Sequence, residues 1–202
     1  MAGSGEKESA ALLPVFLKVA GRRVVLVGGG PVAAAKMGGL TGAGADVLVV
    51  APELRQEILE RARDTKGLVV AARPFRPDDL DGAWLVVAAA TPEVNRQVAA
   101  AAEGRRLFVI AVDDPEAASA YGAGVVRRAG VTVAVSTDGA APALAGLVRE
   151  GLDALLPAED EMQAWMAEAR SLRPAWRAEG VPLGERRPLL LAALNRLYER
   201  KP

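Results

Sequence analysis

The fold is decided by one stretch near the start of the chain, Val24-Val25-Leu26-Val27-Gly28-Gly29-Gly30-Pro31-Val32-Ala33. A run of valine and leucine leads directly into three glycines, and a helical pattern opens at the proline. Strand, glycine loop and helix in this order form the G-x-G-x-x-A variant of the dinucleotide-binding fingerprint. Gly28 is expected to make the tight turn and Gly30 to let the backbone approach a pyrophosphate, while Ala33 allows close helix packing. The alternative, a turn that needs small residues for packing alone, is disfavoured by the order of the three elements.

Short uncharged runs alternate with helical patterns from Arg22 to about Ala111. The runs do not alternate with polar residues, which is typical of parallel strands covered by helices on both faces. The predicted strands are residues 24–27, 47–50, 68–71, 85–88 and 107–111, and the predicted helices are residues 32–43, 53–63 and 93–103. This pattern predicts an α/β fold, with a Rossmann-like parallel sheet and helices on both faces.

The pattern changes after Ala111. Two strand-like runs, residues 125–128 and 131–136, are separated only by Ala129-Gly130 and predict a hairpin. A helix over residues 142–155 ends at a proline, and apolar residues at helical spacing continue from residue 159. We therefore expect a dinucleotide-binding domain (1–112), a small α+β region of hairpin and helix (113–156) and a helical tail (157–202). Pro174, Gly180, Pro182, Gly184 and Pro188 are expected to punctuate the tail helices.

Composition excludes several classes of function. The 25 Lys and Arg residues balance the 25 Asp and Glu residues, so no net charge favours nucleic acid or an anionic membrane as partner. With no cysteine and no histidine, thiolate nucleophiles and the usual zinc sites are excluded, and no metal site is predicted. Acid and base chemistry must then fall to Asp, Glu, Lys, Tyr or Ser. No run reads as a signal peptide or membrane helix, so a cytoplasmic protein is expected.

The end of the second predicted strand bears on the choice of dinucleotide. An acidic residue about twenty positions after the glycines usually holds the adenosine ribose of NAD. Here the nearest carboxylate is Glu53, after Pro52. Glu53 either reaches the ribose or favours the start of its helix through the helix dipole, and the sequence leaves both open. No arginine stands at the strand end itself, so NADP has little positive support, although the residues alone do not decide between NAD and NADP.

In combination, several short segments resemble one known family. They are Leu13-Pro14-Val15-Phe16-Leu17, the glycine loop with Lys36, Val50-Ala51-Pro52-Glu53, Pro92-Glu93-Val94-Asn95, Val112-Asp113-Asp114-Pro115 and Val135-Ser136-Thr137-Asp138-Gly139. The chain resembles the precorrin-2 dehydrogenase module, which is also the amino-terminal part of multifunctional siroheme synthases. The resemblance implies NAD-dependent oxidation of precorrin-2 to sirohydrochlorin by a homodimer.

The resemblance also implies roles for individual residues. Pro31 and Val32, with Pro52 and Glu53, are implied to border the nucleotide. Asp113 matches the acidic residue tied to the chemistry, and Ser136 and Thr137 match a hydroxyl-bearing loop that lines the site. From the residues alone, Asp113 is a candidate proton acceptor beyond the end of a strand, or a cap for the turn at Asp114-Pro115. Ser136 either orients the substrate or caps the helix that follows.

Tetrapyrrole substrates carry many carboxylates, so arginines near the hairpin are candidate substrate ligands. These are Arg127, Arg128 and Arg149, each of which is otherwise a solvated surface residue.

Two alternative functions stay open. One is a bifunctional enzyme that also inserts Fe²⁺ into sirohydrochlorin, for which the resemblance is weaker because polar residues common in the family are replaced at Ala111 and Ala141. The other is a regulatory module that senses a dinucleotide without catalysis.

Overall fold

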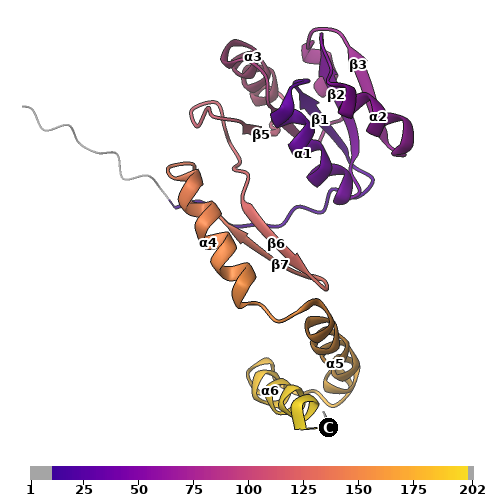
Figure 1. Ribbon diagram of the computed structural model, residues 1–202, viewed down its shortest axis with the longest axis vertical. Coiled ribbons are helices and arrows are strands. Elements are labelled where there is room, and N and C mark those ends of the chain that lie inside the picture. The colour runs from indigo at the N-terminus through magenta and orange to yellow at the C-terminus, as the bar shows by residue number, and fades with distance from the viewer. Residues whose placement is uncertain (1–10, 200–202) are drawn as a thin grey trace, which may run out of the picture. The chain divides into compact units, whose positions relative to one another are not determined.

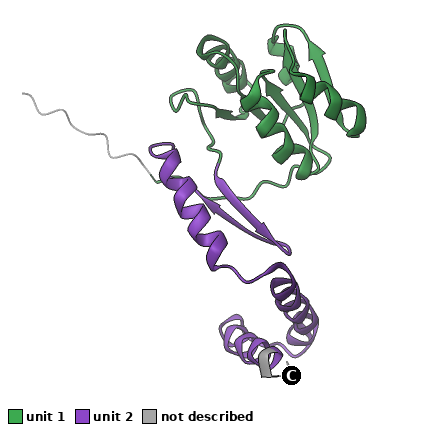
Figure 2. Cartoon of the chain, in the orientation of Figure 1, with its two compact units in different colours: residues 1–122 green, residues 123–202 purple. Residues whose placement is uncertain are grey.

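The computed structural model describes residues 11–199. By packing, the chain divides into two compact units, one ending at Gly122 and the other beginning at Ala123 (Figure 2). None of the helices within the described range combines the length and apolar character needed to cross a lipid bilayer.

The first unit is built on a five-stranded parallel sheet with the strand order β3-β2-β1-β4-β5 (Figure 1). The strands are β1 (Arg23–Val27), β2 (Asp46–Ala51), β3 (Leu68–Ala72), β4 (Leu85–Ala88) and β5 (Phe108–Ala111). The chain runs outward from β1 through β2 to β3 and then returns to the other side of β1. The order of the strands thus reverses between β1 and β4, where open α/β sheets bind their ligands.

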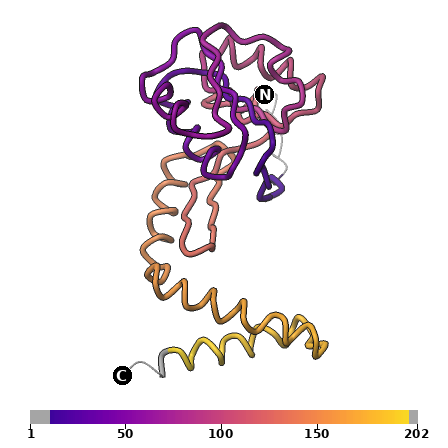
Figure 3. Tube along the Cα trace, turned by 90° about the vertical axis from the view of Figure 1, so that its right-hand side faces the viewer, coloured from indigo at the N-terminus to yellow at the C-terminus, as the bar shows by residue number. Residues whose placement is uncertain are grey.

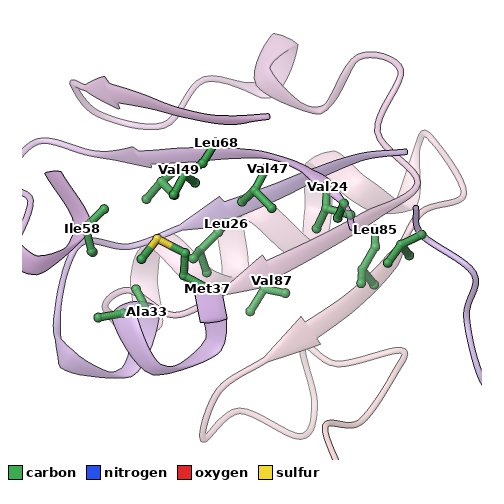
Figure 4. Close-up of a cluster of buried hydrophobic side chains, with 13 residues drawn as sticks. Val24, Leu26, Ala33, Met37, Val47, Val49, Ile58, Leu68, Leu85 and Val87 are labelled. Atoms are coloured by element: carbon green, nitrogen blue, oxygen red, sulfur yellow. The ribbon is translucent and has the colours of Figure 1, made fainter. Parts of the chain in front are cut away.

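Helices cover both faces of this sheet because its central strands are apolar on both sides. On one face, α1 (Pro31–Gly42) and α2 (Gln56–Asp64) pack over Val24 and Leu26 of β1, and Met37 of α1 lies in the same cluster (Figure 4). On the other face, α3 (Pro92–Glu103) and the short 3₁₀ helix η1 (Pro77–Leu80) cover Val25 and Val27. Fully burying a Val or Leu side chain stabilises a fold by about 1.5–3 kcal/mol, so β1 is the central element of the core. The α/β fold expected from the sequence is confirmed.

One predicted boundary in this unit is displaced. The second helix was expected to begin at Glu53, but α2 begins at Gln56. Arg55 is extended, with φ −61° and ψ 147°, and its N–H donates to the carbonyl oxygen of Gly29 at 3.0 Å. The segment after β2 is therefore extended at Arg55 and not helical, because Arg55 is hydrogen-bonded to the glycine loop.

The first unit also continues past the expected boundary at residue 112. After β5 the chain turns back, and the N–H groups of Ser119 and Ala120 donate to the carbonyl oxygen of Val109 at 3.0 and 2.9 Å. The N–H of Val109 in turn donates to the Ser119 hydroxyl at 2.9 Å. Ser119 and Ala120 are thus hydrogen-bonded to β5, an edge strand of the sheet.

The second unit opens with the predicted hairpin, β6 (Gly124–Arg128) and β7 (Val131–Val135). Both turn residues have positive φ, 47° at Ala129 and 88° at Gly130, as a two-residue type I′ turn requires. Helix α4 (Pro142–Leu155) packs along this hairpin, and α5 (Glu159–Ala178) folds back on α6 (Leu183–Glu199) (Figure 3).

The expectation that every proline and glycine of the tail would interrupt a helix is wrong. Pro174 lies inside α5, and Gly184 and Pro188 lie inside α6, so only Gly180 and Pro182 separate the two helices. An interior proline costs about 3 kcal/mol because it lacks an N–H and crowds the preceding turn. The packing of α5 against α6 and β6 offsets this local preference.

An ion pair joins the end of β3 to η1. Arg73 Nη1 donates to Asp79 Oδ2 at 2.9 Å, and the N–H of Arg76 donates to the same oxygen at 2.8 Å. Asp79 is only 6% exposed. The hydrogen bond from Arg73 lowers the pKa of Asp79 below its ordinary value, burial opposes this, and the Arg76 N–H reinforces it. The charged form of Asp79 is therefore the one that stabilises the fold.

We expect the substitution Asp79→Asn to destabilise the protein in a pH-dependent way. A hydrogen bond to a charged group is worth about 1.5–3 kcal/mol, so the free energy of unfolding near neutral pH is expected to fall by about that amount. Because the folded-state pKa lies below the unfolded value of about 3.9, this stabilisation is present above about pH 4. It is lost as the pH falls through the folded-state pKa, so the variant and the wild type converge in urea unfolding curves in acid.

The matched control is Asp78→Asn, because the Asp78 side chain is 91% exposed. Its effect on unfolding is expected to stay within about 0.5 kcal/mol. An equal loss for Asp79→Asn at neutral and at acid pH would show that the charge of Asp79 does not carry the stabilisation.

Candidate active site

The glycine loop brings three backbone segments together at very short range. The N–H of Gly28 donates to the carbonyl oxygen of Val50 at 2.9 Å, and Gly28 has a φ of 134°. A Cβ atom added to Gly28 would lie 2.2 Å from the carbonyl oxygen of Ala89, and one added to Gly29 would lie 1.9 Å from that of Glu53. Only glycine fits at these two positions. The loop after β1 is therefore held against the segments that follow β2 and β4.

Gly30 differs, because no protein atom requires a glycine there. It is the N-cap of α1 with a φ of −85°, and no side chain caps the helix. Chain neighbours aside, no atom of residues 11–199 lies within 4 Å of a Cβ added to Gly30. Gly30 thus keeps a space open beside the first-turn N–H groups of α1, where the helix dipole favours an anion. The pyrophosphate of a dinucleotide fits this cradle, as the fingerprint predicts.

A pocket of about 320 Å³ lies at the same end of the sheet. It is lined by Val32 of α1, Ala89 and Ala90 after β4, Pro92 and Asn95 of α3, and Val112, Asp113 and Asp114 after β5. Hydrogen bonds that continue the strand ladders hold its walls: the N–H of Ala89 donates to Val27 at 2.8 Å, and that of Val112 to Ala88 at 2.9 Å. The pocket therefore joins the start of the glycine-loop helix to the acidic segment after β5.

The two acidic residues in the pocket wall have different tasks. Asp114 accepts a hydrogen bond from the N–H of Ala117 at 3.2 Å and so caps the turn. Asp113 is exposed and, within the described residues, its carboxylate has no hydrogen-bond or ion-pair partner. Its φ of 55° is a left-handed conformation that few non-glycine residues adopt. The turn-capping role that the sequence left open for Asp113 thus belongs to Asp114.

Asn95 is a site residue to which sequence reasoning gave no role. It is 2% exposed, and its side chain joins two walls of the pocket. Its Oδ1 accepts from the N–H of Ala90 at 3.0 Å, and its Nδ2 donates to the carbonyl oxygen of Val112 at 3.4 Å. The available signal was a polar residue on the helix face that also carries Val98, since buried polar side chains need partners.

The predicted nucleotide-contacting residues lie around the glycine loop. Pro31 and Val32 are exposed in the first turn of α1, and Pro52 and Glu53 are exposed immediately after β2. The Glu53 carbonyl approaches Gly29, and no described residue binds the Glu53 carboxylate. All four residues are thus accessible at the carboxyl end of the sheet.

The remaining candidate residues are two hydroxyl-bearing residues and three arginines, and all of them belong to the second unit. Ser136 Oγ accepts from the N–H of Asp138 at 3.2 Å, and Thr137 Oγ1 accepts from the N–H of Ala141 at 3.2 Å. Both hydroxyls therefore stabilise the turn that leads into α4. Each can still donate its proton to a ligand, because a hydroxyl has one donor in addition to its acceptor lone pairs.

The three candidate arginines differ in how their guanidinium groups are used. Arg128 pairs with Asp153 and donates to the carbonyl oxygens of Leu156 and Pro157 at 3.0 and 2.8 Å, so it caps the end of α4. Arg149 lies 3.1 Å from the carboxylate of its neighbour Glu150. Arg127 is exposed, with no partner among residues 11–199. The structure thus gives Arg128 a structural role and leaves Arg127 the most accessible.

Fold and loop together define a dinucleotide-binding α/β protein. A family model described as "Putative NAD(P)-binding" matches residues 15–123, which is more than half of the chain. The chain belongs to this family, and a nicotinamide dinucleotide is its cofactor.

Curated relatives are similar over most of this chain. It is 43% identical to "Siroheme synthase 3" of Aeromonas hydrophila over 176 residues, which is 87% of this chain and 37% of the relative. It is 44% identical to "Siroheme synthase" of Photorhabdus laumondii over 146 residues, which is 72% of this chain and 31% of the relative. The chain therefore spans about a third of the length of these relatives.

A solved structure shares the fold. "SirC, precorrin-2 dehydrogenase" superimposes with a TM-score of 0.67 at 23% identity, covering 90% of this chain and 88% of that one. The likeness thus extends over both compact units.

We expect Gly30→Val to abolish dinucleotide binding without unfolding the protein. The added side chain has room in the protein but fills the space kept for the pyrophosphate. Calorimetric titration with NAD is expected to show at least about a hundredfold rise in Kd, since about 3 kcal/mol corresponds to such a factor. The Tm is expected to stay near that of the wild type.

The control is Gly39→Val on the exposed side of the same helix, where an added Cβ also has no atom of the described residues within 4 Å, chain neighbours and the helix's own backbone aside. It is expected to leave both Kd and Tm close to the wild type. Unchanged NAD affinity in Gly30→Val would show that the loop is only a turn.

Proposed function

We propose that this protein is an NAD-dependent dehydrogenase that oxidises precorrin-2 to sirohydrochlorin in siroheme biosynthesis, and that it works in the cytoplasm. The observation that carries the proposal is the pocket that joins the start of α1 to the carboxylate of Asp113, which no residue in the described part of the chain binds. The similarity to siroheme synthases, and the fold shared with a precorrin-2 dehydrogenase, support the choice of substrate.

The chemistry needs a hydride acceptor and a proton acceptor. Conversion of precorrin-2 to sirohydrochlorin removes one hydride and one proton from the macrocycle. When bound, the oxidised nicotinamide supplies the hydride acceptor. The α1 N-terminus and Gly30 hold the pyrophosphate, and the Asp113 carboxylate accepts the proton. No side chain of the described residues competes for that carboxylate.

NAD is the proposed dinucleotide because the Glu53 carboxylate is exposed beside the glycine loop and has no partner among residues 11–199. A carboxylate there accepts hydrogen bonds from the ribose hydroxyls and repels a 2′-phosphate. Arg55 stands two residues further on, and its N–H is bonded to Gly29. A higher affinity for NADP than for NAD would contradict this role of Glu53 and assign the specificity to Arg55 instead.

The substrate's carboxylates are proposed to be bound by the second unit. Arg127 and Arg149 are the proposed cationic ligands, and Ser136 and Thr137 donate hydroxyl protons. Ser136 orients the substrate in this proposal and takes no proton itself. Arg128 is the weakest of the three arginine candidates, because Asp153 and the carbonyls at the end of α4 already bind its guanidinium.

A homodimer is proposed from the apolar outer face of α4. Leu144, Leu147, Val148 and Leu155 repeat at helical spacing and are between 43% and 81% exposed. Ala145, on an adjacent side of α4, is buried, and α4 packs against the hairpin. An isolated two-stranded hairpin is marginally stable, so a second copy that covers this stripe stabilises the whole layer. The dimer rests on this stripe and on the family resemblance.

Anaerobic incubation with precorrin-2 and NAD tests the proposed activity. We expect NADH and sirohydrochlorin to form in equal amounts, as followed by their absorbance. Ferrous or cobaltous ion is then added, and loss of the sirohydrochlorin spectrum above the protein-free rate would make the enzyme bifunctional. No grouping of three metal-binding carboxylates occurs in the described part of the chain, so the protein-free rate is expected. NAD binding without NADH formation would favour a dinucleotide sensor.

Asp113→Asn is expected to lower kcat by about 10²- to 10⁴-fold, the usual contribution of a positioned acid or base. Asparagine tolerates the left-handed backbone of this position, so the fold and the NAD affinity are expected to be preserved. The matched control is Glu116→Gln, which removes the same charge from an exposed site on the same segment. Near-normal turnover in Asp113→Asn would remove Asp113 from the mechanism.

Leu147→Glu is expected to convert the dimer to a monomer in sedimentation equilibrium. Leu147 is 68% exposed within the apolar stripe, and a buried unpaired carboxylate at an interface is strongly unfavourable. Val69→Glu is the control, since Val69 is 61% exposed on β3, outside the stripe. A wild-type protein that sediments as a monomer would contradict the proposed dimer.

A further inference from the structure

Asn95 is buried in α3 with both ends of its amide in use. It is one of two buried polar residues in the described chain, and the other, Asp79, forms the ion pair with Arg73. The amide oxygen accepts from a backbone N–H and the amide nitrogen donates to a backbone carbonyl. Because the two backbone partners have opposite polarity, only one orientation of the amide satisfies both.

Those two backbone partners belong to different walls of the pocket. The N–H of Ala90 lies in the loop after β4, and the carbonyl of Val112 lies immediately before Asp113. The N–H of Val112 is already fixed to Ala88 at 2.9 Å. With its carbonyl held by Asn95, Val112 is anchored through both of its backbone polar groups, and the oxygen of the peptide unit that precedes Asp113 is fixed.

We propose that Asn95 is a positioning residue that holds Asp113 in its reactive conformation and sets the separation between the loops after β4 and β5. This inference rests on the proposed function. Asp113 has a left-handed backbone, with φ 55°, which costs an aspartate less than most residues but is still less favourable than the right-handed or extended regions, so a fixed Val112 helps to hold it. Among the described side chains, that of Asn95 is the one that bonds the residue before Asp113.

An apolar residue of similar size fills the same volume but leaves two backbone groups without partners. Asn95→Leu therefore removes both bonds, and Asn95→Asp keeps the acceptor for Ala90 but loses the donor for Val112 at neutral pH. Loss of the second bond alone is expected to release Asp113. Asn95→Asp and Asn95→Leu are thus expected to affect turnover similarly, although only the leucine removes the bond to Ala90.

The matched control is Val98→Ala on the same helix. Val98 is fully buried against the sheet and does not line the pocket, so its truncation destabilises the fold without touching Asp113. If Asn95 had only a structural role, its variants would lose no more activity than Val98→Ala does for the same fall in Tm.

The first measurement does not depend on the reaction. Backbone nuclear magnetic resonance of the full chain follows the amides of Ala90, Val112 and Asp113. Asn95→Leu is expected to shift the Asp113 resonances and to speed amide exchange at Ala90 at least about tenfold, corresponding to about 1.4 kcal/mol of lost protection. Val98→Ala is expected to leave the Asp113 resonances in place. Unmoved Asp113 resonances in both Asn95 variants would overturn the inference, whatever the enzyme's activity.

The second measurement is a double-mutant cycle with Asp113→Asn. In the wild-type background, Asn95→Leu is expected to lower kcat about 10- to 100-fold, as misplacing a catalytic group does, while KM for NAD changes less than about threefold. In the Asp113→Asn background the same change is expected to have no further effect on kcat, because the group it positions is gone. Additive losses would show that Asn95 does not act through Asp113. A wild-type protein that forms no NADH would contradict the proposed function, and the resonance measurement would still decide the role of Asn95.

Discussion

The close approach of the glycine loop to two neighbouring carbonyl oxygens is the constraint on which the site depends. Hydrogen atoms occupy the positions where side chains at Gly28 and Gly29 would collide with the backbone of Ala89 and Glu53. That approach places the start of α1 between the segments that follow β2 and β4. It also fixes the segment after β2 through the bond from Arg55 to Gly29, so one steric condition organises the entire carboxyl end of the sheet.

The elements of the first unit could be predicted because their cause is local. Continuous apolar runs bounded by glycine or charged residues permit little besides buried parallel strands, and the structure places β4 at the predicted residues 85–88. The prolines of the tail were misjudged because their cost is local while the gain is tertiary. An interior proline costs about 3 kcal/mol, and whether helix packing offsets this cost cannot be seen in a single sequence. The start of α2 was displaced for the same kind of reason, since the competing bond comes from a loop more than twenty residues away.

Some residues of the candidate site could be predicted from the sequence with their roles, and others could not. The spacing of Gly28 and Gly30 is that of the dinucleotide-binding fingerprint, so it predicts the tight turn and the open space beside the helix start. Asp113 and Asp114 are adjacent and chemically identical, so only the bond from Ala117 shows which of them caps the turn. Asn95 lies in one of the segments that carry the family resemblance, but the segment gives it no role, because that role depends on the backbone groups of two loops that only the folded sheet brings together. The same limit applies to Arg128, whose carbonyl partners lie at the far end of the next helix.

Oxidation of a tetrapyrrole and insertion of a metal ion into it need different polar groups in the site. Oxidation of a tetrapyrrole needs one proton acceptor beside a bound nicotinamide, and a single carboxylate without a competing partner meets that need. Binding a divalent ion as it enters a macrocycle draws on several oxygen or nitrogen ligands that converge on one point. In the described chain Asp114 is already committed to a turn, and no third carboxylate joins the pair to form a metal-binding group. The described arrangement supplies the single proton acceptor, Asp113, that the proposed oxidation requires.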